Sequence, residues 1–569
     1  MKMWKRMAAM GLCLALAAGT LAGCGGGSAP GLALRLSVGQ EAGSYDPIRA
    51  ETAEAETVIV HLYENLLRKA PDTSGGTTLA SGVAKKYDME ENYDGTVTYT
   101  FHLRQAKWSD GQTVTAGDFV YAWQRLADPV TNSPSASLLS AVAGYDEVRS
   151  SGDVSKLQVS AEGELTFVVT LLGKCDWFLE DVCTDPATMP LRQDNLQTLK
   201  EEAIQENLQA EERGETGTRN WASDPARLVT NGPYTASRGE EGELILTRSE
   251  TYVGGVSGPE ELRFLFHDSP EAAWETYAAG EADFVSPLPR AETEAKAESD
   301  WAGAALSQTT VLLFHTQGEV FPDVQARKAF SLAIDRQALS DLTALVSRPA
   351  EGLVPYGVPD ENGEDFRTQG GDLVGESGTE EALAEANALL GESGYGSSAV
   401  PRFVYEDTEE NAALADALWK AWMKGLKVRL ERVPLSADEL REALSAGDYD
   451  IALTDIRGNA LDAESFLDLW RGDSPENVAG YENGAYDTLL KVIRSASDEK
   501  ARQGCLHDAE ALLLDDCPVA PLLFTASAWE AREGLVGILR DGRGFFSFAS
   551  AMFLGATALT RLPLMDTSH

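Results

Sequence analysis

Cysteine, basic residues and long apolar runs are scarce in this chain, and each scarcity excludes a class of protein. Its 569 residues include 6 cysteines, 47 basic residues and 90 acidic residues, for a net charge of −43. Such a surface repels nucleic acid and anionic lipid, so we expect no nucleic-acid partner. The acids are spread along the chain, which is typical of a well-solvated surface rather than of an acidic tail.

The cysteines do not suggest a disulfide framework. Two of them lie close to the N-terminus, and the other four form two spaced pairs, Cys175 with Cys183 and Cys505 with Cys517. The patterns around both pairs are helical, and eight helical residues already span about 12 Å, which exceeds the reach of a disulfide. We therefore expect these four cysteines to be buried free thiols.

Catalytic motifs are also missing. The six histidines include no pair at metal-ligand spacing, and the sequence contains no nucleophile elbow, Walker loop or GxGxxG phosphate loop. Paired acids are frequent, but any chain this acidic has them, so they carry little information. The sequence therefore predicts no enzyme, no metal and no cofactor. A hydrolase is the open alternative, which a panel of chromogenic substrates would test.

The N-terminus has the features of a secretion signal, predicted over residues 1–24. A basic start precedes the apolar residues 7–21, which are too few for a typical membrane-spanning helix. The last four residues, Leu-Ala-Gly-Cys, resemble a bacterial lipobox, in which the thiol of Cys24 receives a diacylglycerol. A soluble secretory signal with a chance cysteine is the alternative. Residues 25–31 then predict a flexible tether.

Residues 97–129 are the most informative stretch of the mature chain. Apolar and polar residues alternate over 97–103, which predicts a half-buried strand. A turn follows, and then Thr115 is a good helix N-cap with Asp118 three positions further on. Apolar residues at i, i+4 and i+7 predict an amphipathic helix that ends before Pro129. Local physics thus predicts a strand–turn–helix unit with its two tryptophans in the core.

The residues of this unit also carry a specific resemblance. The motifs are Phe101-x-Leu103-Arg104, Lys107-Trp108-Ser109-Asp110-Gly111, Val114-Thr115-Ala116-x-Asp118-Phe119 and Trp123. They resemble the signature of the extracellular solute-binding proteins of peptide ABC transporters, the oligopeptide- and dipeptide-binding family known as family 5. Family-like phrases recur along the chain, so that the resemblance covers nearly all of residues 32 to about 552.

The resemblance implies an α/β protein with the two-lobed periplasmic-binding-protein fold (type II-like, cluster C) and a small domain inserted in lobe I. Lobe I is expected to comprise residues 32–69, 193–312 and 525–569, the inserted domain residues 70–192, and lobe II residues 313–524. Residues 195–216 are polar and charge-rich with helical spacing, and we expect them to form a surface insertion. In lobe II, a strand over 403–405, a helix over 410–424 and a strand over 427–430 are expected to form a βαβ unit.

The implied function is to capture a peptide or peptide-like solute between the lobes and deliver it to the permease of an ABC importer. A peptide-sensing signalling lipoprotein and a binding protein for a non-peptide solute are the alternatives. We expect a monomer that is lipid-anchored through Cys24 to the outer face of the bacterial membrane, or periplasmic.

The ligand anchor of the family is altered in this chain. Relatives commonly have W-x-x-D-Y-x-D/E-P-x-x-F, and the first Asp holds the α-amino group of the bound peptide. Aligned back from Phe466, Asn459 replaces that Asp, Ile456 replaces the Trp, and Asp462 takes the second acidic position. Either a nearby acid takes over the role of the missing Asp, or the natural ligand has no free amine there.

The remaining candidate contacts follow from the same comparison. Asp455, Asp462 and Glu51 are the candidate substitute acids, and Arg457 is the candidate partner of a ligand carboxylate. Ser135 stands where relatives often have an aromatic residue. A surface acid and a loop serine are the alternative interpretations of Glu51 and Ser135. The candidate ligand-binding residues are Asn459, Arg457, Asp455, Asp462, Glu51 and Ser135.

Overall fold

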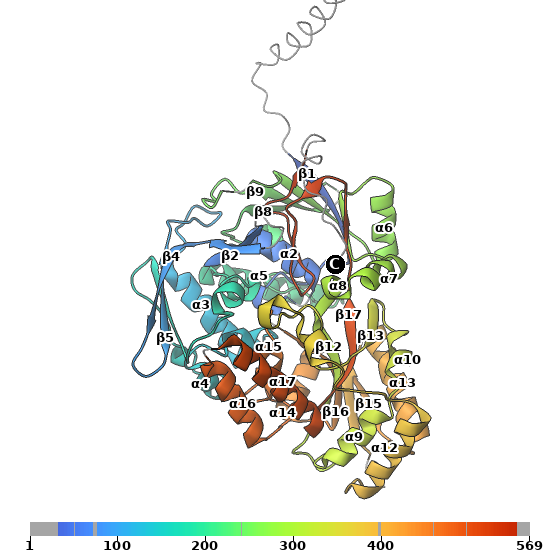
Figure 1. Cartoon of the computed structure of the whole chain (residues 1–569). Helices are drawn as coiled ribbons and strands as arrows, with labels where there is room; N and C mark the ends of the chain where they lie inside the picture. The colour runs from blue at the N-terminus through green and yellow to red at the C-terminus, as the bar shows by residue number, and fades with distance from the viewer. Residues whose placement is uncertain are drawn as a thin grey trace, which may run out of the picture.

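Two lobes, each built on a six-stranded sheet, make up the structure (Figure 1). It is a computed structural model, and it describes residues 32–554 except for 51, 72–76, 241, 256, 397–399, 459 and 497. The predicted signal peptide, the tether and Cys24 therefore lie outside the described residues, as do Glu51 and Asn459.

The first sheet forms lobe I and has the order β18-β11-β1-β10-β9-β8. β1 is parallel to β10 and β11, and the outer strands pair in the antiparallel sense. Its strands are β1 (Ala33–Val38), β8 (Tyr234–Arg238), β9 (Leu244–Arg248), β10 (Glu261–Phe266), β11 (Phe284–Ser286) and β18 (Glu530–Ala531). Its helices are α2 (Ala53–Leu62), α5 (Gln193–Glu212), α6 (Pro270–Ala278), α7 (Arg290–Ser299) and α8 (Trp301–Ala304).

A four-stranded antiparallel sheet, β4-β5-β7-β6, occupies the segment predicted as the inserted domain. Its elements are β4 (Ala84–Glu91), β5 (Val97–Leu103), α3 (Ala116–Ala127), α4 (Tyr145–Ser151), β6 (Val159–Ala161) and β7 (Thr166–Leu171). The aromatic side chains of this sheet belong to the same hydrophobic core as those of the lobe I sheet, so the two sheets fold as one body.

The strand–turn–helix unit predicted from residues 97–129 is confirmed. β5 alternates between buried and half-buried positions, as its sequence requires. The backbone N–H and the hydroxyl of Thr115 donate to the Asp118 carboxylate, which fixes the start of α3. Trp108 and Trp123 are fully buried, so they fill the core beneath the turn.

The second sheet forms lobe II and has the order β13-β17-β12-β16-β14-β15. β12 is its central strand and is buried on both faces. Leu312 and Phe314 belong to one hydrophobic core, and Val311 and Leu313 belong to another on the opposite face. Its strands are β12 (Ala305–Phe314), β13 (Val346–Pro349), β14 (Arg402–Glu406), β15 (Glu431–Leu435), β16 (Ile451–Arg457) and β17 (Val519–Ala526).

Nine helices among the described residues cover the two faces of this sheet. They are α9 (Val324–Leu332), α10 (Arg336–Ser340), α11 (Phe366–Gly370), α12 (Glu380–Glu392), α13 (Glu409–Gly425), α14 (Ala437–Ala446), α15 (Glu464–Leu467), α16 (Gly484–Ser495) and α17 (Glu499–Asp516). No helix in the described part of the chain is long and apolar enough to span a membrane.

Two neighbouring strands carry the chain between the lobes. α8 of lobe I runs directly into β12, and β17 leads back to β18 in the lobe I sheet. β12 and β17 pair with each other, and the N–H of Ser527 donates to the carbonyl of Ala304 at 2.9 Å. This double crossing, here called the hinge, joins the two lobes. The predicted lobe boundaries fall within these two strands and stay a prediction.

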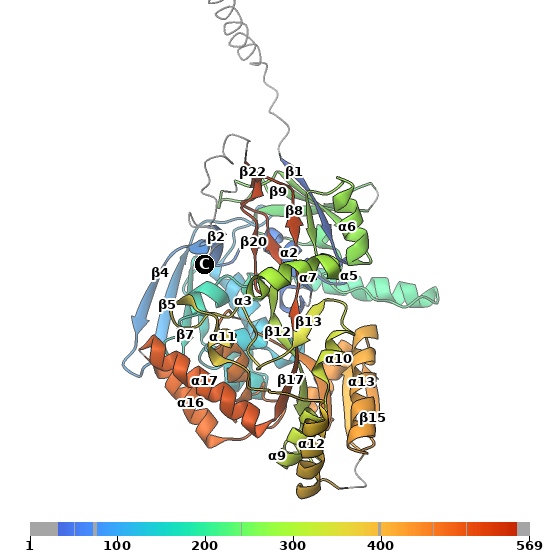
Figure 2. The ribbon, with the colours of Figure 1, turned by 45° about the vertical axis from the view of Figure 1, so that its right-hand side comes forward.

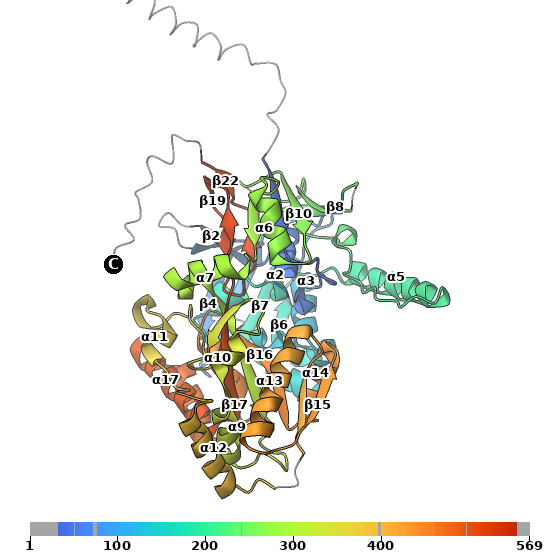
Figure 3. The same ribbon diagram turned by 90° about the vertical axis from the view of Figure 1, so that its right-hand side faces the viewer.

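Helix α5 projects from lobe I as a separate arm (Figures 2 and 3). Leu196, Leu199 and Ala203 are buried near its base, whereas Ile204 and Leu208 are about half exposed further along. The surface helix expected over 195–216 is therefore present, and it starts two residues earlier than expected.

Two local predictions differ from the structure. A strand is expected over 427–430, but the strand begins at Glu431, where its pairing with Arg402 of β14 starts. Lys427 has a left-handed φ of 58°, which an extended strand does not contain. Residues 175–183 contain only one helical turn, Phe178–Val182, rather than a helix. The four described cysteines are free, as expected, but Cys175 and Cys505 are only partly buried.

Candidate ligand-binding cavity

A cavity of about 310 Å³ lies between the two lobes. Lobe I contributes residues from β2 (Leu67–Pro71), from the segment 181–189 and from the C-terminal segment 539–550. Lobe II contributes Ser307 on β12 and the loop after β16, with Gly458, Ala460 and Leu461. A ligand in this cavity would touch both lobes at once, which is how a two-lobed binding protein couples binding to closure.

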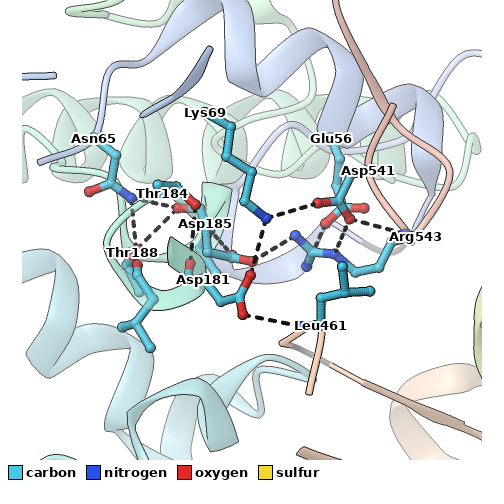
Figure 4. Close-up of polar contacts among 12 residues, drawn as sticks. Glu56, Asn65, Lys69, Asp181, Thr184, Asp185, Thr188, Leu461, Asp541 and Arg543 are labelled. Atoms are coloured by element: carbon cyan, nitrogen blue, oxygen red, sulfur yellow. Dashed lines mark hydrogen bonds and ion pairs between the residues drawn. The ribbon is translucent and has the colours of Figure 1, made fainter. Parts of the chain in front are cut away.

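Arg543 is the centre of a buried ion-pair cluster in the cavity wall (Figure 4). Its guanidinium lies 2.9 Å from the Glu56 carboxylate, 2.6 Å from Asp185 and 3.4 Å from Asp541. The three acids come from α2, from the loop before the short helix 186–188, and from the turn that carries Arg543 itself. One arginine thus ties three separate segments of lobe I together.

Lys69 extends this cluster toward lobe II. Its ammonium lies 3.1 Å from Asp181 and 3.8 Å from Asp541. The other oxygen of Asp181 accepts a hydrogen bond of 3.2 Å from the backbone N–H of Leu461, across the lobe boundary. The backbone N–H of Ser307 also donates a hydrogen bond of 2.8 Å to the carbonyl of Gly542, and this bond joins the lobes nearby. The cluster therefore helps to hold the two lobes in contact.

The acids of the cluster titrate differently because burial and the two cations act on each of them to a different degree. Burial raises the pKa of Glu56 to about 7, although Arg543 opposes the shift. Burial likewise raises the pKa of Asp181 and of Asp185, with Lys69 and Arg543 opposing it. Burial favours the neutral form of Asp541 too, but Arg543 and Lys69 prevail and its pKa is lowered.

A third ion pair lines the same cavity on the lobe I side. Arg68 lies 3.2 Å from Glu64 and donates a 2.6 Å hydrogen bond to the Tyr252 hydroxyl, which in turn donates to Glu64. Burial raises the pKa of Glu64 and also raises the pKa of Tyr252, so that the phenol stays protonated at neutral pH.

 The carboxylate, the phenol and the guanidinium are thus joined in one closed set of hydrogen bonds, with Tyr252 in its neutral form because burial raises its pKa.

A smaller cavity of about 210 Å³ adjoins the hinge. Its wall includes Glu54 and Glu56 of α2, Gln308 of β12 and Arg457 at the end of β16. It shares Ser307 and Arg543 with the larger cavity. Of the candidate ligand contacts, Arg457 is the one that the structure places in a cavity wall among the described residues.

The other described candidates lie outside both cavity walls. Asp455 accepts a 2.7 Å hydrogen bond from the hydroxyl of Thr310 on the neighbouring strand. Asp462 lies 2.8 Å from Arg502 and accepts a hydrogen bond from the N–H of Glu464. Ser135 is buried just before the short helix Ala136–Leu139. Their roles in ligand binding stay a prediction, as do those of Glu51 and Asn459.

The sequence pattern did not point to Lys69, Asp181, Asp185, Asp541 or Arg543. These residues come from three distant segments, and charged residues at such separations form no motif. The turn Asp541-Gly542-Arg543-Gly544 was the one available signal, because charged side chains on a glycine-containing turn can face a cleft. Within the described residues, no group of three or more histidine, cysteine or acidic side chains could hold a metal ion.

A cavity lined by two lobes that are joined by two strands is the arrangement of a two-lobed solute-binding protein. The chain belongs to the bacterial extracellular solute-binding proteins, family 5, whose description, "Bacterial extracellular solute-binding proteins, family 5 Middle", matches residues 78–477. The family predicted from residues 101–123 is thereby confirmed.

Relatives of known name agree with this assignment. The chain is 26% identical over 457 residues to the dipeptide-binding protein DppE of Bacillus subtilis, covering 79% of this chain and 80% of that protein. It is 27% identical over 511 residues to the "Probable deoxycholate-binding periplasmic protein YgiS" of Escherichia coli, covering 87% and 88%. The solved structure of the Escherichia coli murein tripeptide binding protein MppA has a TM-score of 0.67 and 25% identity, covering 90% of this chain and 96% of that one. The predicted two-lobed α/β fold is confirmed.

Proposed function

We propose that this protein captures a short peptide or peptide-like solute between its lobes and delivers it to the permease of an ABC importer. The observation that carries the proposal is the cavity of about 310 Å³ that residues of both lobes line. Its size is at the small end of the range for small-molecule pockets, roughly 300–1,000 Å³. The names of DppE and MppA, which bind a dipeptide and a murein tripeptide, support a peptide of this size.

Mass spectrometry of the solute that co-purifies with the native protein tests this proposal. We expect peptides of two to a few residues, released when the purified protein is unfolded. A single non-peptide solute in stoichiometric amount would contradict it. That outcome would favour the second candidate, a binding protein for a small non-peptide solute, which the resemblance to YgiS supports.

Transport and signalling are separate outcomes of a second experiment. We propose transport, with the permease as the partner and with no catalytic reaction at the cavity. Deleting the gene should abolish uptake of the captured solute. Unchanged uptake with a lost transcriptional response would favour the signalling lipoprotein instead. Turnover of any substrate in a chromogenic panel would contradict the proposal that the protein is not an enzyme.

We also propose that the mature protein is a monomer anchored through a lipid on Cys24 to the outer face of the membrane. The lipobox-like residues 21–24 and the Gly-rich residues 25–31 support the anchor. Two acyl chains are enough for stable anchoring. Replacing Cys24 with serine should move the protein from the membrane fraction to the soluble fraction, and membrane retention of the variant would contradict the anchor.

The proposed ligand contacts at Asn459, Arg457, Asp455, Asp462, Glu51 and Ser135 have a direct test. An Asp that faces a ligand ammonium makes a charge-assisted bond worth about 1.5–3 kcal/mol, whereas an Asn offers only about 1 kcal/mol. We expect the wild type to distinguish little between a free and an N-acetylated peptide in titration calorimetry, and Asn459→Asp to prefer the free amine. A wild-type preference of about a hundredfold, or 2.7 kcal/mol, would mean that a substitute acid exists.

A further inference from the structure

The charges that line the larger cavity do not all have partners. The described lining residues include four acids, and each has a cation within ion-pair distance. Glu64 pairs with Arg68, Asp181 with Lys69, Asp185 with Arg543, and Asp541 with both Lys69 and Arg543. One lining cation is left over, because no carboxylate of the described residues lies within ion-pair distance of Arg540.

Arg540 is held in place by carbonyl groups alone. Its two terminal nitrogens donate to the carbonyls of Gly303, Ala304, Ala305 and Ser527, at 3.0 to 3.3 Å. Carbonyl oxygens orient a guanidinium but do not neutralise its charge. Burial accordingly lowers the pKa of Arg540, and Asp541 opposes the shift only in part. The site is therefore a fixed cation in a cavity wall without a counter-ion.

The position of Arg540 links the cavity to the hinge. Gly303 and Ala304 end α8, Ala305 begins β12, and Ser527 follows β17. The side chain thus bridges both crossings between the lobes, while it also lines the cavity. An anion bound beside Arg540 would lie where the two lobes meet, and it would gain most when the closed cavity excludes water.

We propose that Arg540 receives a carboxylate of the bound solute. This inference rests on the proposed peptide-binding function and names the ligand chemistry that the cavity selects. The carboxylate can belong to the C-terminus of a peptide or to an acidic side chain, and both present the same planar pair of oxygens to a guanidinium. The wall also supplies the hydroxyl of Ser307, which is buried and has no hydrogen-bond partner among the described residues.

A peptide-capture experiment tests the proposal. The full chain, stripped of bound solute, is incubated with a random tripeptide library in two forms, one with free C-termini and one with amidated C-termini. Mass spectrometry then identifies the captured peptides. We expect wild type to enrich carboxylate-bearing peptides over neutral amides by about tenfold or more. Enrichment of amidated peptides that contain Asp or Glu would indicate a side-chain carboxylate, and enrichment of free C-termini would indicate the terminal one.

Two variants assign the effect to Arg540. Arg540→Gln should reduce the enrichment to about threefold or less, and Arg540→Lys, which keeps the charge but loses the fork, should lie between it and wild type. Arg532→Gln is the matched control, because Arg532 pairs with Asp283 outside the cavity, and it should behave as wild type. The ratio between the two libraries is insensitive to a general loss of folded protein.

Each of the other possible outcomes would contradict a particular part of the proposal. Equal capture by wild type of free-acid peptides and of amidated peptides that lack Asp and Glu would overturn the carboxylate proposal and leave the peptide function standing. Full enrichment by Arg540→Gln would overturn the assignment to Arg540. If wild type captured neither library, the peptide function would be contradicted. The melting temperature in acetate and succinate would then decide the anion site, because a rise must occur in wild type and be absent in Arg540→Gln.

Discussion

Two arginines three residues apart, in the same cavity wall, have opposite surroundings. Arg543 contacts three carboxylates, whereas Arg540 contacts four backbone carbonyls and no carboxylate of the described residues. The charge of Arg543 is neutralised by carboxylates of lobe I, and these ion pairs join three segments of that lobe. Arg540 keeps a net charge at the hinge. Two arginines in one cavity wall can therefore have different roles: Arg543 stabilises the fold, and Arg540 is proposed to bind the ligand.

The largest expected effect separates these two roles by stability. Arg543→Met would leave Glu56, Asp185 and Asp541 buried without their main counter-charge, and we expect a loss of about 3–5 kcal/mol in the free energy of unfolding. Arg540→Gln removes hydrogen bonds to neutral carbonyls and should cost only about 1 kcal/mol. Urea denaturation at neutral pH measures the free energy of unfolding of both variants. Equal losses for the two variants would break the comparison.

The second prediction concerns the pH dependence of the Arg543 cluster. The pKa of Glu56 rises from 4.5 to about 7 on folding. The folded state therefore binds the proton more tightly, so that this group destabilises the fold increasingly as pH rises from about 4.5 to about 7, by roughly 3 kcal/mol in all. Wild type should lose this stability and Glu56→Gln should not.

Denaturation curves at pH 4.5 and pH 8 provide the measurement. The difference in unfolding free energy between Glu56→Gln and wild type should be larger at pH 8 than at pH 4.5. Arg540→Gln serves as the control and should follow the wild-type pH profile, because it leaves the three carboxylates paired with Arg543. Superimposable profiles for wild type and Glu56→Gln would show that Glu56 does not carry the raised pKa.

The smallest expected effect lies at a contact between the lobes that is away from the hinge. The Glu476 carboxylate of lobe II accepts hydrogen bonds from the Tyr145 hydroxyl at 2.7 Å and from Arg149 at 3.0 Å, both on α4. Glu476→Gln should weaken closure by about 1 kcal/mol, since the pair is partly exposed. Small-angle scattering should show a larger radius of gyration for the variant than for wild type. The exposed Glu482→Gln is the control, and an unchanged radius for Glu476→Gln would exclude a role in closure.

Much of the local structure could be predicted because its causes are local. The alternation over 97–103 and the Thr115–Asp118 capping box each depend on residues within a few positions of one another. The strand predicted at 427–430 is wrong, because Lys427 has a left-handed backbone and the pairing with β14 begins only at Glu431. Sequence patterns do not reveal such a backbone choice in a residue other than glycine.

The sequence by itself determined the family and the two-lobed fold through the resemblance of its motifs. It determined the buried tryptophans of the signature unit through apolar periodicity and capping, which act over short distances. Only the tertiary structure decided which charges face the cavity. Lys69, Asp181, Arg540 and Arg543 meet there because the chain crosses between the lobes twice and returns its C-terminal segment to lobe I. Whether a charge is paired depends on which distant segment lies beside it, and that is a property of the assembled fold.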